Sequence, residues 1–235
     1  MLNKRLLAQI IVYLVGLTIL AFGVVFAINS ALGISPVNAV PFASSIVSGV
    51  GMGISVTVFF LICIGLQIIL LGKEFKWINL TQIIFSFIFG FLVDFGIWVI
   101  GDFTFAALMG DNVMLSYIGQ LIMKAISLVL IAIGLAVYLD AKLINLPSEG
   151  LCLAIVDKTG KTFPKVKVAF DCVLVIIAIS ITLIFLGRLE GIREGTVIAA
   201  IFIGKLIPMV RKFTVPALDK FGFYALRDIE VKKED

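Results

Sequence analysis

The chain has 235 residues, of which 61% are hydrophobic and only 14% are charged. This composition lies far from that of soluble globular domains and indicates an integral membrane protein. The formal net charge of +4 requires no nucleic-acid partner, and the absence of histidine excludes histidine-based triads and proton relays. The three cysteines, Cys63, Cys152 and Cys172, form no close-spaced pair, so we expect neither a disulfide nor a metal site.

Six apolar segments are long enough to cross about 30 Å of hydrocarbon, which takes about 20 helical residues each. The predicted spans are 7–29, 52–71, 79–101, 115–139, 168–186 and 194–210. The first span follows a basic N-terminus, as a signal peptide would. It is too long for one and ends without a small-residue cleavage pattern, so we expect it to be retained.

Basic residues outside the spans give the orientation. With both termini inside, nearly all of them lie on inner segments, and the outer loops hold only Arg188 and Arg193. This asymmetry fits the positive-inside rule and predicts cytoplasmic N- and C-termini.

The first half of the sequence recurs weakly in the second. A shift of 111 residues matches the halves without a gap through the first loop, and a shift of 115 continues the match into the third span. The matched positions are Gly23 with Gly134, Leu32 with Leu143, Pro36 with Pro147, Gly49 with Gly160, Gly72 with Gly187 and Thr81 with Thr196. Each half holds three spans, an odd number, so equivalent spans must run in opposite directions.

The predicted fold is therefore an all-α integral membrane protein with six transmembrane helices in two inverted three-helix repeats. The repeats occupy residues 1–101 and 115–210, an outer connector occupies 102–114, and a cytoplasmic tail occupies 211–235. In membrane proteins built this way, the substrate site usually lies where the two halves meet.

A proline follows shortly after the first span of each half. Proline disfavours helix in the preceding residue and often begins a new helix. The apolar segments after Pro36 and Pro147 are too short to cross, so each predicts a short helix, either interfacial or re-entrant. Re-entrant helices would direct free backbone N–H groups at a shared space, which suits anions or substrate carbonyls.

Six residues around these breaks are the predicted substrate contacts. They are Asn29, Pro36, Asn38, Asp140, Pro147 and Glu149. Glu149 has a competing role, because an acidic side chain in a first helical turn also stabilises the helix N-terminus.

Four ionisable residues lie within the spans, where such groups normally face the bundle interior. Depths estimated at about 1.5 Å per residue sort them into an outer pair, Asp94 with Lys124, and an inner pair, Asp171 with Lys205. The pairs either neutralise charge structurally or serve gating or proton coupling. A lysine near a span end could instead extend to the headgroups.

Small residues on the third span of each half predict close helix packing. They are Ser86, Gly90, Gly195 and Gly204.

Several short motifs resemble the YczE/YyaS/YitT family of bacterial integral membrane proteins. They are Gly23 with Leu32-Gly33-Ile34-Ser35-Pro36, Leu146-Pro147-Ser148-Glu149-Gly150, Lys167-Val168-Ala169-Phe170-Asp171, and Gly195-Thr196-Val197 with Gly204. The resemblance extends to about residue 210 and implies a multi-pass protein of the bacterial inner membrane. Some relatives carry a Gly-Pro-Arg-Asp-like stretch at the second loop, whereas this chain does not, so a basic contact there is not transferred. The resemblance implies no substrate and no functional residues.

The sequence thus predicts a small secondary transporter or permease for an unidentified small solute, with the bilayer and that solute as partners and no cofactor. Phosphate-binding loops, paired-histidine motifs and nucleophile elbows are absent, so we expect no enzyme. The alternative is a non-transporting accessory or assembly protein for another membrane complex, and lipid handling is a third class. A homodimer is compatible with so slim a bundle.

Overall fold

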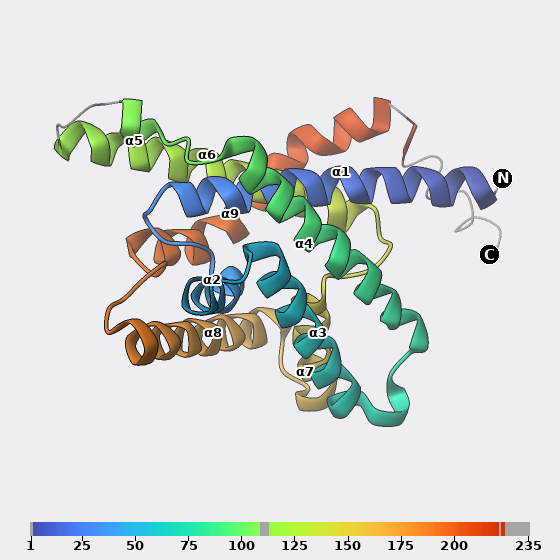
Figure 1. The fold of residues 1–235 in the computed structure, drawn as a ribbon. Coiled ribbons are helices and arrows are strands. Elements are labelled where there is room, and N and C mark those ends of the chain that lie inside the picture. Colours follow the sequence, from blue (N-terminus) through green and yellow to red (C-terminus); the bar gives the residue numbers. More distant parts are fainter. Residues whose placement is uncertain (1, 109–112, 221, 224–235) are drawn as a thin grey trace.

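The computed structural model describes residues 2–108, 113–220, 222 and 223, and over these residues it contains helices and no strand. The long helices are α1 (Leu2–Asn29), α3 (Met52–Leu71), α4 (Thr81–Ile100), α6 (Val113–Asp140), α8 (Phe163–Leu186) and α9 (Glu194–Lys220). The short ones are α2 (Pro36–Ser48), α5 (Phe105–Leu108) and α7 (Pro147–Thr159), with 3-10 turns at Gly72–Glu74 and Trp77–Leu80 (Figure 1). The centre of the predicted connector and most of the predicted tail beyond Lys220 lie outside the described residues.

Five of these helices, α1, α3, α4, α6 and α8, are long and apolar enough to cross a membrane. They correspond to the first five predicted spans. Their outer faces carry large exposed side chains such as Phe91, Trp98 and Ile184, as expected for surfaces in lipid. The all-helical membrane class is therefore confirmed.

The sixth predicted span is not among the helices that are long and apolar enough to cross. It lies within α9, which is 27 residues long and contains two prolines, Pro208 and Pro216. Lys205, Arg211 and Lys212 lie along the stretch that would have to cross. The three basic residues are the reason that α9 is not among the five. The sequence placed Lys205 within the span and the other two in the tail.

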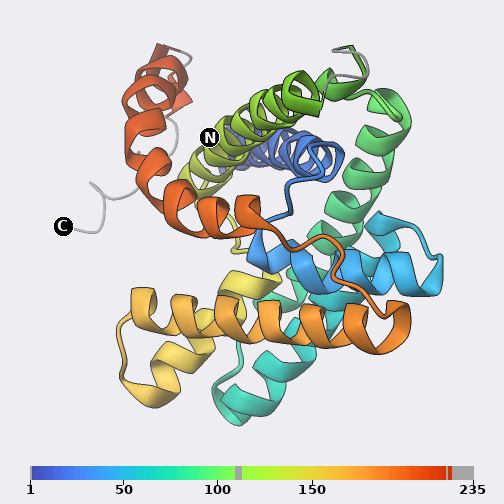
Figure 2. The same cartoon turned by 90° about the vertical axis from the view of Figure 1, so that its left-hand side faces the viewer.

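The most extensive helix contact among the described residues is that of α1 with α6, which lie side by side in Figures 1 and 2. A β-carbon on Gly16 would lie 2.5 Å from the Tyr138 backbone nitrogen, and one on Gly134 would lie 2.5 Å from that of Leu20. Gly23 faces Ile131 in the same way, at 2.8 Å. Glycine therefore recurs in the two halves because each helix presents its backbone to the other.

The predicted packing role holds for most of the small residues of α4 and α9. Gly90 faces the backbone of Gly53 on α3, and a β-carbon on Gly195 would lie 2.5 Å from the Leu32 carbonyl oxygen. Ser86 is fully buried, and its hydroxyl donates to the Gln82 carbonyl. For Gly204 the prediction is wrong, because no atom lies within 4 Å of a β-carbon built there.

The two short helices α2 and α7 bury their first turns against the long helices. Each has 13 residues, starts at a proline, and ends at a glycine with left-handed backbone, Gly49 with φ of 72° and Gly160 with φ of 65°. Among the described residues, Ala31 and Lys142 are the non-glycine positions with positive φ, 55° and 50°. Helix α2 packs on α8 and α3, and α7 packs on α3 and α8. Both predicted proline breaks are therefore confirmed, with the same backbone course.

We expect Gly134→Ala to lower the melting temperature of the protein in detergent, because overpacking a tight contact costs about 1–3 kcal/mol. Gly65→Ala is the matched control, since a β-carbon on Gly65 of α3 meets no atom within 4 Å. Equal melting temperatures of the two variants would contradict the close crossing of α1 and α6.

Candidate functional site

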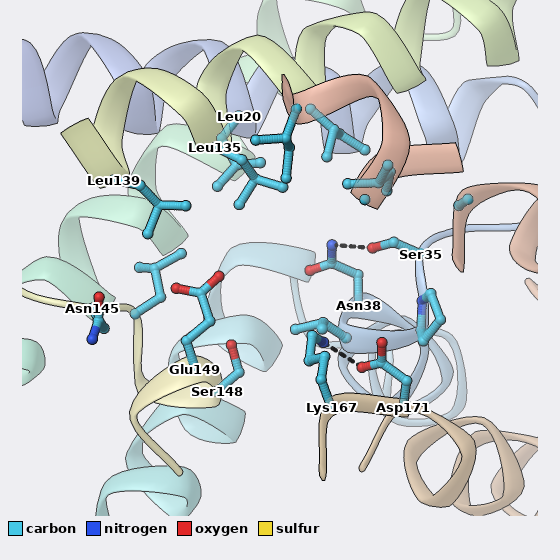
Figure 3. A pocket seen from close by; sticks show the side chains of 18 of the residues that line it. Leu20, Ser35, Asn38, Leu135, Leu139, Asn145, Ser148, Glu149, Lys167 and Asp171 are labelled. Atoms are coloured by element: carbon cyan, nitrogen blue, oxygen red, sulfur yellow. Dashed lines mark hydrogen bonds and ion pairs between the residues drawn. The ribbon is translucent and has the colours of Figure 1, made fainter. Parts of the chain in front are cut away.

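The first turns of α2 and α7 meet at a cavity of about 510 Å³ (Figure 3). Its upper wall consists of aliphatic side chains of α1 and α6, including Leu20, Ile131 and Leu135, and Phe60 and Phe89 come from α3 and α4. The polar side chains at the cavity are Ser35, Asn38, Asn145, Ser148, Glu149, Lys167 and Asp171.

Glu149 is the polar residue that the structure directs most plainly into this cavity (Figure 3). It lies in the first turn of α7, where the preceding Pro147 starts the helix, and the Tyr138 hydroxyl donates a hydrogen bond to its carboxylate. No basic group of the described residues forms an ion pair with it. Burial raises the pKa of the Glu149 carboxyl above its ordinary value.

Asn38 occupies the equivalent position on α2, 111 residues earlier. Its amide donates to the Ser35 hydroxyl at 2.8 Å, and its side chain is 9% exposed. The repeat in the sequence thus brings Asn38 and Glu149 to one cavity from two helices (Figure 3).

The predicted inner pair of Asp171 with Lys205 is wrong. Asp171 pairs instead with Lys167, one turn earlier on α8. A lysine four residues away on the same helix is a nearer partner than one on another helix. Lys205 is exposed on α9, 6.0 Å from the centre of the Phe202 ring.

The predicted outer pair of Asp94 with Lys124 is wrong as well. Asp94 accepts a hydrogen bond of 2.6 Å from the Gly53 backbone N–H at the start of α3. Lys124 donates one of 2.6 Å to the Gly33 carbonyl, in the loop before α2. Helix termini and loops leave backbone groups without intrahelical partners, and these two charges bind such groups.

Three of the six predicted substrate contacts line the cavity, namely Pro36, Asn38 and Glu149. Asn29 lies elsewhere, because its amide donates to the Gly101 and Phe103 carbonyls. Asp140 forms an ion pair with Arg211 of α9.

Pro147 lies beside the cavity without lining it. Its carbonyl accepts a hydrogen bond of 3.0 Å from the Gln67 side chain.

Sequence reasoning missed four polar residues of the cavity. Ser35, Asn145 and Ser148 flank the proline breaks, so the breaks themselves were their signal. Lys167 was counted as an inner-loop charge, although it stands four residues before Asp171 on a predicted helix.

A second, more polar cavity of about 350 Å³ adjoins the first. Gln67, Glu74, Lys76 and Gln82 of the α3–α4 region line it, with Asp157 of α7. Asn145 and Leu153 line both cavities, so these two side chains form the wall between them.

Comparison with known proteins identifies a family. Residues 7–212 match the family described as a family of unknown function, DUF6198. The chain belongs to this family.

Two relatives come from Bacillus subtilis strain 168. The uncharacterized protein YyaS is 31% identical over 153 residues, 64% of this chain and 69% of the relative. The uncharacterized membrane protein YczE is 29% identical over 217 residues, 91% of this chain and 88% of the relative.

These matches confirm the resemblance to the YczE and YyaS proteins. Together with the apolar helices, they show a membrane protein. No solved structure matches the chain significantly.

Replacing Lys124 tests its structural contact with the loop. We expect Lys124→Met to destabilise the DUF6198 protein by about 1.5–3 kcal/mol, the usual worth of a hydrogen bond to a charged group, measured by thermal unfolding in detergent. Lys205→Met is the control, because Lys205 is exposed. A Lys124→Met protein as stable as the control would show that the contact with Gly33 contributes nothing.

Proposed function

We propose that this protein is a small secondary transporter that binds its solute in the cavity between the first turns of α2 and α7. One observation supports it above the others. Two proline-started helices from different halves of the chain meet there and present Asn38 and Glu149, a carboxylate with no ion pair among the described residues. Discontinuous helices whose N-termini meet at a polar site are typical of transporters.

We further propose that the two halves are inverted repeats. Pairing each helix with its counterpart 111 to 115 residues later matches α1 with α6, α2 with α7, α3 with α8 and α4 with α9. The contact of α2 with α8 then corresponds to that of α7 with α3, and α1 with α4 corresponds to α6 with α9. The positive φ angles of Ala31 and Lys142 recur at the same spacing. These correspondences support one unit used twice.

The second cavity provides an access route in this proposal. It lies against the lysine-rich α3–α4 turns, and only Asn145 and Leu153 are shared with the solute cavity. Rocking one half against the other would move Leu153 and Asn145, which both belong to the second half, relative to α3 and α4 of the first half. The wall between the cavities would then open as the opposite side closes.

Alternating access can be tested without knowing the solute. In a variant with Cys63, Cys152 and Cys172 replaced by alanine, Asn38→Cys should react with a membrane-impermeant maleimide added from either side of the membrane. Ala39→Cys is the control, because Ala39 is 1% exposed against α8 and should stay unlabelled. Labelling of Asn38→Cys from one side only would contradict transport and favour the accessory role.

The topology proposal places both termini in the cytoplasm of a bacterial cell. It requires α9 to cross as the sixth span, for which its 27 residues give about 40 Å at ~1.5 Å each. A green fluorescent protein fused after Asp235 should therefore fluoresce, and alkaline phosphatase at that position should be inactive. Fusions in the predicted outer connector should give the reverse. An active phosphatase at the C-terminus would show five crossings.

A further inference from the structure

We infer that the ligand of the α2–α7 cavity is an amphipathic organic monocation, with Glu149 as its counter-ion. This inference rests on the proposed function only in taking that cavity as the ligand site. Binding of such a cation does not require that it be transported.

The balance of charge in the cavity is the first argument. Three ionisable side chains line it, Glu149, Lys167 and Asp171. Lys167 and Asp171 pair with each other on α8, so together they add no net charge. The Glu149 carboxylate receives a neutral hydrogen bond from Tyr138 and no ion pair among the described residues. Glu149 is half-buried. A carboxylate partly withdrawn from water without a cation is costly, so a cationic ligand gains by supplying the missing charge.

The shape and lining of the cavity are the second argument. Glu149 points into the cavity between Asn145 and Asn38, and most of the remaining wall is aliphatic or aromatic (Figure 3). Phe60 and Phe89 stack with ring centres 5.8 Å apart and present aromatic surface to the same space. A small inorganic cation would leave this apolar wall unfilled. A hydrophobic body with one positive charge fits both parts, and aromatic rings attract such cations further.

The way into the cavity is the third argument. Leu139 of α6 and Phe163 of α8 line the cavity and remain 38% and 37% exposed. They form an apolar rim, so the entrance suits a ligand that partitions into the bilayer.

The arrangement of α8 and α9 adds to this (Figure 2). The contact of α3 with α4 has no counterpart of similar extent between α8 and α9, since α8 packs chiefly on α2 and α9 on α6. Both α8 and α9 nevertheless contribute residues to the cavity, among them Asp171 and Ile203. A ligand with an apolar body can therefore approach from the side facing lipid.

The charge of Glu149 gives the binding a pH dependence. Burial raises the pKa of its carboxyl, so it takes up a proton earlier than an exposed glutamate as the pH falls. The charged or titratable groups around it are Tyr138 of α6, Tyr13 of α1 and the Lys167–Asp171 pair of α8. Protonation removes the counter-ion, and so affinity for a permanently charged cation should fall toward acid pH.

The test is equilibrium binding of radiolabelled tetraphenylphosphonium to the purified full-length protein in lipid nanodiscs. We expect saturable binding that Glu149→Gln weakens at least about tenfold and Glu149→Asp partly retains. Glutamine keeps the size of the side chain and can still bond Tyr138. Glu190→Gln is the control, because Glu190 lies in a surface pair with Arg188 and should leave binding unchanged.

Two further measurements do not depend on the folding of a variant. Tetraphenylborate, an anion of the same shape, should show no saturable binding when it is tested alone, and wild-type binding of tetraphenylphosphonium should weaken as the pH falls. Saturable binding of tetraphenylborate, pH-independent binding of the cation, or unchanged affinity of Glu149→Gln would overturn the inference. The cationic group could belong to a membrane lipid or to a free solute, and binding in nanodiscs with and without phosphatidylethanolamine distinguishes the two. Weaker tetraphenylphosphonium binding in the presence of this lipid would assign the site to lipid amines. Equal binding would assign it to free cations.

The outcomes separate this inference from the transport proposal. Cation binding without labelling of Asn38→Cys from both sides keeps the inference and rejects transport. Labelling from both sides with no cation binding keeps transport and rejects the inference.

Discussion

The structure depends on satisfying the backbone where two membrane helices are broken. No water is available in hydrocarbon to bond free N–H and C=O groups, so irregular backbone at that depth needs protein partners. In the first loop, Lys124 binds the Gly33 carbonyl, and the Ile34 N–H and the Leu32 carbonyl bond to Gly191 and Gly195. Gln9 binds the Ala141 carbonyl of the second loop. These bonds hold the starts of α2 and α7 inside the bundle, and the cavity exists because they are held there.

This requirement also explains how most polar side chains of the spans are used. Asp94 binds the start of α3, Ser127 donates to the Gly23 carbonyl, and Gln67 bonds both Gln82 and the Pro147 carbonyl. A polar residue in a membrane helix is therefore not in itself evidence of a ligand. The polar side chains that face the cavity are few. Among the three ionisable ones, Glu149 is the one with no ion pair to another described residue.

The sequence predicted helices and their breaks more reliably than side-chain partners. Hydropathy and proline positions locate elements along the chain, and repeated glycines mark backbone contacts such as that of Gly134. The charge pairs were predicted only from the depth of each residue along its helix, and depth does not tell which way a side chain points. The rotation of each helix about its axis decides whether Asp94 can reach Lys124, and the backbone carbonyls that compete for a lysine leave no mark in a sequence. Asn29 and Asp140 were misplaced for the same reason, since their partners lie in the α4–α5 loop and on α9.

The two roles weighed for Glu149, helix capping and ligand contact, do not exclude each other. The first turn of α7 places its carboxylate where the helix N-terminus favours negative charge, and the same turn directs it into the cavity. The equivalent turn of α2 carries Asn38, which is neutral and bonded to Ser35. If one three-helix unit was duplicated, as proposed above, Asn38 and Glu149 occupy equivalent positions of the two copies. Only the second of them carries a charge. The first turn of α2 therefore presents a neutral amide to the cavity, and the first turn of α7 presents a carboxylate.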